Sequence, residues 1–165
     1  MSVSLTRSPA SQTFGLVIAV VVCFGAAGLG AAATTPRIPN WYAELAKPDW
    51  TPPAWVFGPV WTTLYLAMAV AVWLVWRARP TATIRLPLAL FGVQLVLNSL
   101  WSVLFFGMQR PDLALVDIGA LWAAIGATLL SFWPYSNAAS LLLAPYLAWV
   151  SYAAVLNFSI WQLNR

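Results

Sequence analysis

The sequence contains no histidine, and its only cysteine is Cys23. A single cysteine cannot form an internal disulfide. Structural zinc sites are built from cysteine and histidine, and Ser-His or Cys-His catalytic pairs need an imidazole base. A haem iron held by an axial histidine is excluded for the same reason. The sequence therefore predicts no metal site and no catalytic residues of these kinds.

Charge is also scarce. Only 7% of the residues are charged and 62% are hydrophobic, whereas a soluble domain carries about 25% charged residues. The eight Lys/Arg and four Asp/Glu give a formal charge of +4, but they are scattered, without the basic stripe that nucleic-acid binding requires. We expect an integral, multi-pass protein that contacts the lipid bilayer and no nucleic acid.

Long apolar segments take the place of charge. Each is about 20 residues or longer, which is the length that crosses a bilayer as a helix, and prolines and arginines bound them. The predicted spans are residues 14–33, 54–76, 86–108, 111–133 and 138–163. We predict an all-α membrane protein, a five-transmembrane-helix bundle, with a disordered extension over 1–12 and one domain over 13–165.

Small residues recur at four-residue spacing in two of these spans. Ala26 and Gly30 lie in the first span, and Gly119, Ala123 and Ala127 lie in the fourth. Such spacing lets helix backbones approach closely, so we expect both faces to pack against neighbouring helices. The length of the first span favours a retained helix over a cleaved signal peptide.

The distribution of basic residues gives little information on orientation. An odd number of spans puts the termini on opposite sides, and each side then receives four Lys/Arg. The denser cluster of Arg77, Arg79 and Arg85 favours its own side as cytoplasmic.

Only the connection between the first two spans, about 36–53, is long. From Trp41 to Trp55 it reads WYAELAKPDWTPPAW. The prolines forbid a regular helix, and the aromatic residues can pack, whereas a solvated linker would be rich in Gly, Ser and charge. We predict a structured loop that forms a lid at the membrane surface.

Polar and aromatic side chains share faces inside the spans. In the third span Gln94, Asn98 and Ser102 recur at steps of four, with Trp101 on an overlapping face. A buried polar group in a membrane needs a partner. Two interpretations stay open for Asn98: a hydrogen bond between helices, or a contact to a ligand. Similar faces carry aromatic residues in the second and fifth spans: Trp61, Tyr65, Tyr146, Trp149 and, beside them, Ala153.

Asp117 lies within the fourth span. It could pair with Arg110 or Arg85, or belong to a proton path. We expect the pairing, because one acid without a neighbouring histidine or lysine makes a poor relay.

These groups favour the binding of a flat apolar molecule. Aromatic pairs add about 0.5–1.5 kcal/mol beyond area burial, and amides orient polar edges. Arg37, Lys47 or Arg110 at the rim could attract carboxylates. A tetrapyrrole with propionates or a sterol-like molecule satisfies this description, and without histidine a porphyrin would be held by stacking rather than through its metal.

Three ordered groups of residues resemble the signature of the TspO/MBR family, the tryptophan-rich sensory proteins of bacteria and the translocator proteins of mitochondria. The resemblance extends from about residue 14 to the C-terminus. It is carried by Trp41-Tyr42, Leu45, Lys47-Pro48, Trp50, Pro52-Pro53, Trp55, Phe57, Trp61 and Leu64-Tyr65, by Gln94-Leu95, Leu97-Asn98, Trp101-Ser102 and Phe105-Phe106, and by Pro145-Tyr146-Leu147, Trp149 and Leu156-Asn157-Phe158.

The resemblance implies a five-helix bundle, commonly a homodimer, with a ligand cavity beneath the first loop. Family members bind porphyrins such as protoporphyrin IX, haem intermediates, benzodiazepine-type drugs and, in animals, cholesterol. Positions that match the family's pocket are Tyr42, Trp50, Trp61, Asn98, Trp101, Tyr146, Trp149 and Ala153; Tyr65 and Gln94 complete our predicted ligand-binding set. Positions like Trp61 and Trp149 are linked in bacterial relatives to photo-oxidative porphyrin breakdown.

The sequence departs from the proposed cholesterol motif, which needs a tyrosine followed by a basic residue. Phe158 stands in place of the tyrosine and Gln162 in place of the basic residue. These two replacements make a sterol a less favoured ligand than a tetrapyrrole. They also favour a protein of a bacterial cell membrane.

The leading hypothesis is a membrane sensor or regulator that binds porphyrins as ligands, with no cofactor and no enzymatic activity. A transporter of porphyrins or sterol-like lipids is one alternative, although no broken helices or internal repeats are visible. A light- and oxygen-dependent porphyrin-degrading enzyme is the other.

Overall fold

Five long helices make up most of the protein in the computed structural model, which describes residues 8–165. All five are long and apolar enough to cross a membrane, and residues 8–165 contain no strand. The predicted all-α, five-helix membrane fold is therefore confirmed. The helices are α1 (Pro9–Thr34), α2 (Ala54–Ala78), α3 (Arg85–Ser102), α4 (Pro111–Phe132) and α5 (Asn137–Leu163), joined by the short helical turns η1 (Thr35–Arg37), η2 (Ile38–Tyr42) and η3 (Val103–Gly107).

The predicted bounds of α2 to α5 agree with the structure to within two residues when η3 is counted with α3. The first helix begins earlier than predicted. Ser8 caps it, because its Oγ accepts a hydrogen bond from the Ser11 amide at 3.3 Å, and Pro9 suits the first helical position. Residues 9–12, which we expected to be disordered, form the first turn; residues 1–7 lie outside the described part.

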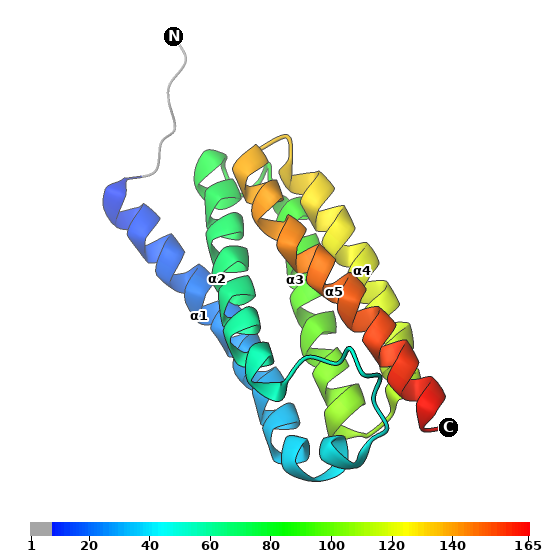
Figure 1. The fold of residues 1–165 in the computed structure, drawn as a ribbon. Coiled ribbons are helices and arrows are strands. Elements are labelled where there is room, and N and C mark those ends of the chain that lie inside the picture. Colours follow the sequence, from blue (N-terminus) through cyan, green and yellow to red (C-terminus); the bar gives the residue numbers. More distant parts are fainter. Residues whose placement is uncertain (1–7) are drawn as a thin grey trace.

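The helices run up and down in one bundle (Figure 1). α4 packs between α3 and α5, α2 packs against α5, and α1 lies at the edge against α2 and α3. The connection from η2 to α2 crosses the lower end of the bundle beside the C-terminal end of α5 (Figure 1). The start of α1 and the end of α5 lie at opposite ends, as an odd number of spans requires.

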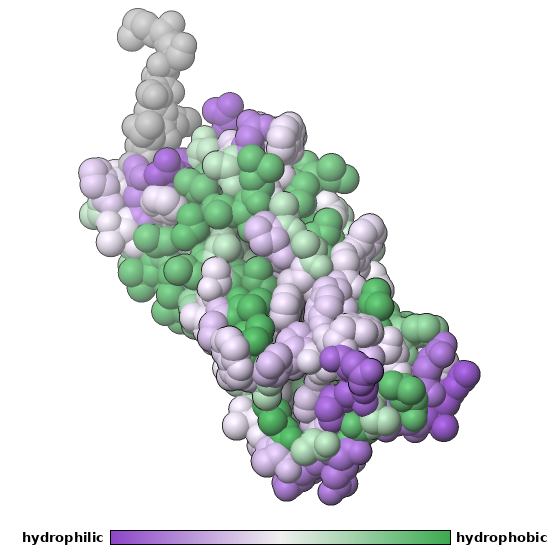
Figure 2. All heavy atoms as spheres, in the orientation of Figure 1, coloured by the Kyte–Doolittle hydropathy of each residue, from purple (hydrophilic) through white to green (hydrophobic). Residues whose placement is uncertain are grey.

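The surface supports a membrane location. On the face that Figure 2 shows, hydrophilic residues gather at the two ends of the molecule, and the surface between them is mostly hydrophobic or neutral. Large apolar side chains such as Phe14, Val116 and Leu130 are exposed on the sides. Exposed apolar area of this extent would be unfavourable in water, so the structure describes a multi-pass membrane protein.

The solid core lies at the end of the bundle remote from the connection 43–53. Met68, Val75, Ile125, Phe132 and Leu143 are fully buried there, and the Phe132 ring stacks on Phe91 at 6.0 Å between centroids. The other end is less completely filled by side chains, and that difference positions the site.

The two stripes of small residues have different roles. Ser99 Oγ of α3 donates to the Ala26 carbonyl at 3.3 Å, and a Cβ added at Gly30 would lie 3.0 Å from Ser102 Oγ. The predicted close approach of α1 is therefore confirmed. α4 is a packing helix, as expected, since it lies between α3 and α5. It contacts them through another face, with Ala114, Ile118, Leu121 and Ile125, and its stripe of small residues is exposed.

Candidate ligand cavity

A cavity of about 650 Å³ lies in the loop end of the bundle. Its volume is within the range of about 300–1,000 Å³ that is usual for small-molecule sites. Residues from α1, the connection, α2, α3, η3 and α5 line it, and α4 supplies no lining residue among those described. Four transmembrane helices and a loop therefore surround one space.

Aromatic rings form much of the wall. Trp101 stacks on Phe105 with centroids 5.2 Å apart, and Phe57 meets Trp149 edge to face at 5.9 Å. Such pairs hold one another in fixed orientations, so the rings present stable flat surfaces to the interior. The aromatic lining residues are Phe24, Tyr42, Trp55, Phe57, Trp61, Tyr65, Trp101, Phe105, Phe106 and Trp149.

Two wide helical turns border the cavity. η2 and η3 are π-helical, a rare geometry that is frequent at functional sites. η3 lets two neighbouring rings, Phe105 and Phe106, both line the cavity. η2 directs Tyr42 inward, and its ring packs against Phe106 at 5.5 Å between centroids. Local backbone geometry thus increases the aromatic area of the wall.

A chain of hydrogen bonds crosses the inner end of the cavity. The Tyr65 hydroxyl of α2 donates to Asn98 Oδ1 at 2.5 Å, and Asn98 Nδ2 of α3 donates to the Tyr146 hydroxyl of α5 at 2.8 Å. All three side chains are buried. Of the two interpretations of Asn98, the interhelical bond is present, although the residue also lines the cavity.

A second amide ties the wall together nearer the loop. Trp101 Nε1 donates to Asn157 Oδ1 at 3.0 Å, and Asn157 Nδ2 donates to the Pro111 carbonyl at 2.9 Å. Asn157 is 1% exposed. It therefore links α5 to α3 and to the start of α4, and it fixes the orientation of the Trp101 ring.

Lys47 holds the start of the loop. Its ammonium donates to the carbonyl of Tyr42 at 2.6 Å and to that of Leu45 at 2.8 Å, with a longer bond of 3.3 Å to Ala43. The ammonium also lies 4.8 Å from the centroid of the Tyr42 ring. These contacts fold the backbone around one cation next to a lining residue.

α5 holds the rest of the loop. Asn164 pairs with both main-chain polar atoms of Ala46, at 3.0 and 2.9 Å. The Tyr152 hydroxyl donates to the Trp50 carbonyl at 3.1 Å, and the two rings meet edge to face. The loop is thus a structured lid, here defined as residues 43–53, anchored on the last helix.

Seven of the ten predicted ligand-binding residues line this cavity: Tyr42, Trp61, Tyr65, Asn98, Trp101, Trp149 and Ala153. The other three do not. Trp50 is 47% exposed and packs on Tyr152 outside the cavity. Tyr146 is fully buried behind the wall, edge-on to Trp61. Gln94 lies one turn deeper than Asn98, where its Nε2 is 3.8 Å from Met68 Sδ.

Sequence reasoning missed the whole contribution of α1. The only signal was the run of small residues, which we interpreted as packing alone. The lining residues outside the predicted set are Phe24, Ala27, Gly28, Gly30, Ala31, Thr34, Thr35, Ile38, Ala54, Trp55, Phe57, Gly58, Thr62, Ser102, Phe105, Phe106, Leu156, Asn157 and Ile160.

None of the described lining residues is charged. Three basic residues were expected at the rim. Lys47 donates its hydrogen bonds to main-chain carbonyls. Arg110 forms a salt bridge of 2.6 Å with Asp112, and the hydrogen bond between them raises the pKa of Arg110. Arg37 is exposed and lies between two lining residues, Thr35 and Ile38. It has no ion-pair partner within residues 8–165.

The predicted pairing of Asp117 is wrong. Arg110 is taken by Asp112, and Asp117 Oδ2, which is buried, has no hydrogen-bond partner among the described residues. Arg85, the other predicted partner, is exposed and forms no salt bridge with Asp117 in the described part of the chain.

Five membrane-length helices, four of which line one aromatic cavity, define a multi-pass membrane protein with a candidate site for an apolar ligand. Comparison with known proteins identifies the group. The model of the TspO/MBR family matches residues 17–162. The chain belongs to the TspO/MBR family, as the resemblance in its sequence implied.

Relatives come from several kinds of organism. The Tryptophan-rich protein TspO of Chlorobaculum tepidum is 44% identical over 156 residues, covering 90% of this chain and 97% of that protein. The Translocator protein of Homo sapiens is 44% identical over 128 residues, 76% of each chain. The Tryptophan-rich sensory protein of Cereibacter sphaeroides is 38% identical over 141 residues, covering 84% of this chain and 87% of that protein.

Proposed function

We propose that this protein is a membrane sensor or regulator that binds a porphyrin in the cavity beneath the lid. The observation that carries the proposal is the wall itself: a space of about 650 Å³ lined by ten aromatic side chains and by no charged side chain among those described. A large, flat, apolar ring system fits such a space, because it stacks on the rings and needs no buried counter-charge.

The polar atoms of the wall support an apolar ligand. Asn98 already bonds Tyr65 and Tyr146, and Asn157 already bonds Trp101 and the start of α4. Because these amides are satisfied by protein partners, a ligand is not required to complete their hydrogen bonds. The cavity therefore offers mainly ring faces and small apolar groups to the bound molecule.

Carboxylates of the ligand belong at the rim. A carboxylate in the apolar interior would be costly without a partner, whereas a propionate at the mouth can stay in water beside a cation. Arg37 is exposed and is flanked by the lining residues Thr35 and Ile38. In this proposal Arg37 is the residue that attracts the propionates of a tetrapyrrole, and Lys47 stabilises the lid.

The test is a binding titration with protoporphyrin IX on protein in detergent micelles, followed by quenching of tryptophan fluorescence. Ala153→Phe fills the cavity from α5, whereas Val155→Phe adds a similar ring on the same helix at a side chain that is 57% exposed. We expect Ala153→Phe to weaken binding at least tenfold and Val155→Phe to bind as wild type. Equal affinity of all three proteins would refute the cavity as the porphyrin site.

Two further measurements distinguish the alternatives. Net accumulation of porphyrin in sealed vesicles that contain only this protein would indicate a transporter. Repeated turnover of porphyrin per protein molecule under light and oxygen would indicate an enzyme. Under the sensor proposal, porphyrin binds without either outcome. The homodimer and the bacterial cell membrane remain parts of the proposal, to be tested by the mass in micelles and by fractionation of cells.

A further inference from the structure

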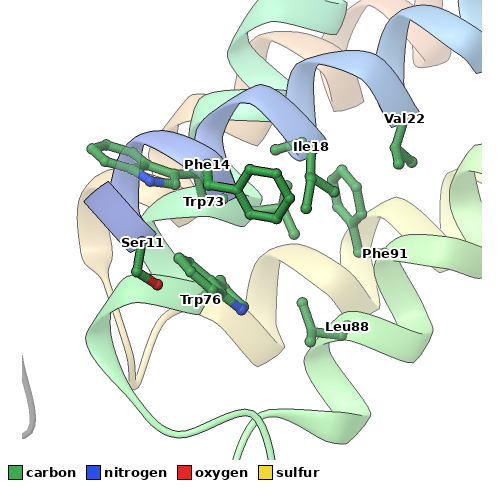
Figure 3. A pocket seen from close by; sticks show the side chains of 11 residues that line it. Ser11, Phe14, Ile18, Val22, Trp73, Trp76, Leu88 and Phe91 are labelled. Carbon is green, nitrogen blue, oxygen red and sulfur yellow. The ribbon is translucent and has the colours of Figure 1, made fainter. Parts of the chain in front are cut away.

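A second, smaller cavity lies at the opposite end of the bundle, between α1, α2 and α3. Its volume is about 320 Å³. Figure 3 shows Phe14, Ile18 and Val22 of α1 facing Trp76 of α2 and Leu88 and Phe91 of α3 across this space. Among the described lining residues, Ser11 alone carries a hydroxyl group. We call this space the upper groove. Within residues 8–165 it shares no lining residue with the cavity beneath the lid.

The upper groove opens towards the bilayer. Three of its α1 residues are about half exposed or more: Phe14 at 67%, Val22 at 52% and Ile18 at 47%. Its floor is formed by buried residues, including Ala19, Val72 and Phe91. All three contributing helices are membrane-length, so lipid chains are the apolar molecules that meet this opening.

The length of the groove matches one leaflet of a membrane. Its α1 lining runs from Ser11 to Val22, which is about 16 Å along a helix axis. Half of the hydrocarbon core of a bilayer is about 15 Å. The groove also starts at the membrane-water boundary, because Trp76 and Leu88 lie at the facing ends of α2 and α3.

A basic cluster surrounds that end of the groove. Arg77, Arg79 and Arg85 are exposed. The Arg77 guanidinium lies over the Trp73 ring, 4.5 Å from its centroid, and Trp73 lines the groove. Arg85 begins α3 one turn before the lining residue Leu88. Positive charge is thus positioned where the headgroup of a lipid in the groove would be.

We propose that the upper groove binds one anionic phospholipid, with an acyl chain against Phe14, Ile18 and Val22 and the phosphate beside Arg77 and Arg85. Basic sites between transmembrane helices bind the headgroups of anionic lipids. The aromatic rings Trp73 and Trp76 suit the interface between headgroup and chain. The bound lipid fills the space between α1 and the residues of α2 and α3 that line the groove.

The test compares phosphatidylglycerol with phosphatidylcholine of the same acyl chains, added to the full-length protein in detergent. Native mass spectrometry counts the lipids that each protein molecule retains. We expect wild type to retain one phosphatidylglycerol in preference to phosphatidylcholine. Because each basic residue near an anionic lipid changes binding about fivefold, Arg77→Gln and Arg85→Gln should each reduce the retention of phosphatidylglycerol by about that factor.

Matched variants separate the groove from the rest of the surface. Val22→Trp fills the groove and should abolish retention of the lipid, whereas Val21→Trp changes a neighbouring side chain that is 64% exposed and does not line it. Arg165→Gln is the control for charge, since Arg165 also lies over a tryptophan, Trp161, but at the other end of the chain. Both controls should retain phosphatidylglycerol as wild type does.

Three results would overturn the proposal. The first is equal retention of the two lipids by wild type, and the second is loss of lipid in Val21→Trp to the same extent as in Val22→Trp. The third is a dimer mass that wild type and Val21→Trp show and Val22→Trp does not. That result would indicate that a second copy of the chain, rather than a lipid, occupies the groove. Porphyrin titrations are independent of these results, because none of the described groove residues lines the cavity beneath the lid.

Discussion

Asn164, the residue before the C-terminus, holds both main-chain polar atoms of Ala46. The Ala46 amide donates to Asn164 Oδ1 at 3.0 Å, and Asn164 Nδ2 donates to the Ala46 carbonyl at 2.9 Å. A third bond, from Nδ2 to the Ile160 carbonyl at 2.7 Å, fixes the amide on α5. One side chain far away in the sequence therefore anchors the lid on the end of α5.

Asn164→Ala should accelerate the exchange of a bound porphyrin. The substitution removes both exposed hydrogen bonds to Ala46; a combined loss of about 1 kcal/mol corresponds to a change of about fivefold, and it acts on opening of the lid rather than on contacts in the cavity. We expect the dissociation rate in stopped flow to rise about fivefold. Gln162→Ala, at a neighbouring exposed residue without a bond to the lid, should leave the rate unchanged; an equal effect of both changes would contradict the role of Asn164.

Lys47→Met should loosen the start of the lid without unfolding the bundle. The substitution keeps an unbranched side chain but removes the donor to the carbonyls of Tyr42 and Leu45. Hydrogen exchange followed by mass spectrometry should show faster exchange in the peptide over 42–47 and no change in α3 or α4. Arg37→Met is the control, because it removes a cation at the rim that has no bond to the lid; unchanged exchange in Lys47→Met would contradict the prediction.

Hydropathy predicted the five spans because each long helix must present apolar side chains to lipid along its whole length. The start of α1 escaped this reasoning. Residues 9–12 read Pro-Ala-Ser-Gln and contain no large apolar side chain, so only the Ser8-Pro9 pair indicates that a helix begins there. We predicted disorder from the average composition of residues 1–12. A capping signal of two residues has little effect on such an average.

Helical periodicity predicted the sides of α2, α3 and α5 that face the cavity, but not how deep the cavity extends. Gln94 and Asn98 share one face, yet the cavity reaches only Asn98. Tyr146 shares a face with Trp149 but lies behind the Trp61 ring. Trp50 is in the lid, where no period relates sequence to direction. Whether these three side chains reach the cavity depends on how the helices and the lid pack against one another. The periodicity within a single helix does not determine that packing.

Small residues have several structural meanings. A Cβ added at Gly30 would lie 3.0 Å from Ser102 Oγ. A Cβ added at Gly28, two residues earlier in the cavity wall, would meet no atom within 4 Å. Gly119 of α4 faces outward. The same composition signal thus corresponds to a helix contact, an open wall and a lipid-facing surface, and only the arrangement of neighbouring helices distinguishes them.

Asn98→Leu should destabilise the bundle more than Tyr65→Phe does. Leucine has a similar size but leaves the buried hydroxyls of Tyr65 and Tyr146 without their amide partner, at a cost of about 1–3 kcal/mol. Tyr65→Phe removes one interhelical bond, which is worth about 0.6 kcal/mol in a membrane protein. Unfolding in mixed micelles measures both values. Equal destabilisation would show that the amide does not organise the three helices.

The seam between α1 and α3 gives the last prediction, which compares two glycines of one helix. Gly30→Ala and Gly28→Ala gain the same helix propensity, about 1 kcal/mol, but only the Cβ at position 30 meets Ser102 Oγ at 3.0 Å. We therefore expect Gly30→Ala to be the less stable of the two variants.

In the Ser102→Ala background the nearest atom is the Ser102 Cβ, at 3.6 Å from the added carbon, which is an ordinary contact. In that background the two glycine variants should have the same free energy of unfolding. The coupling free energy between positions 30 and 102 is then about 0.5–1 kcal/mol. Thermal unfolding of the four proteins in micelles measures this coupling. If the difference persists without the hydroxyl, the close approach of α1 to α3 does not depend on this pair.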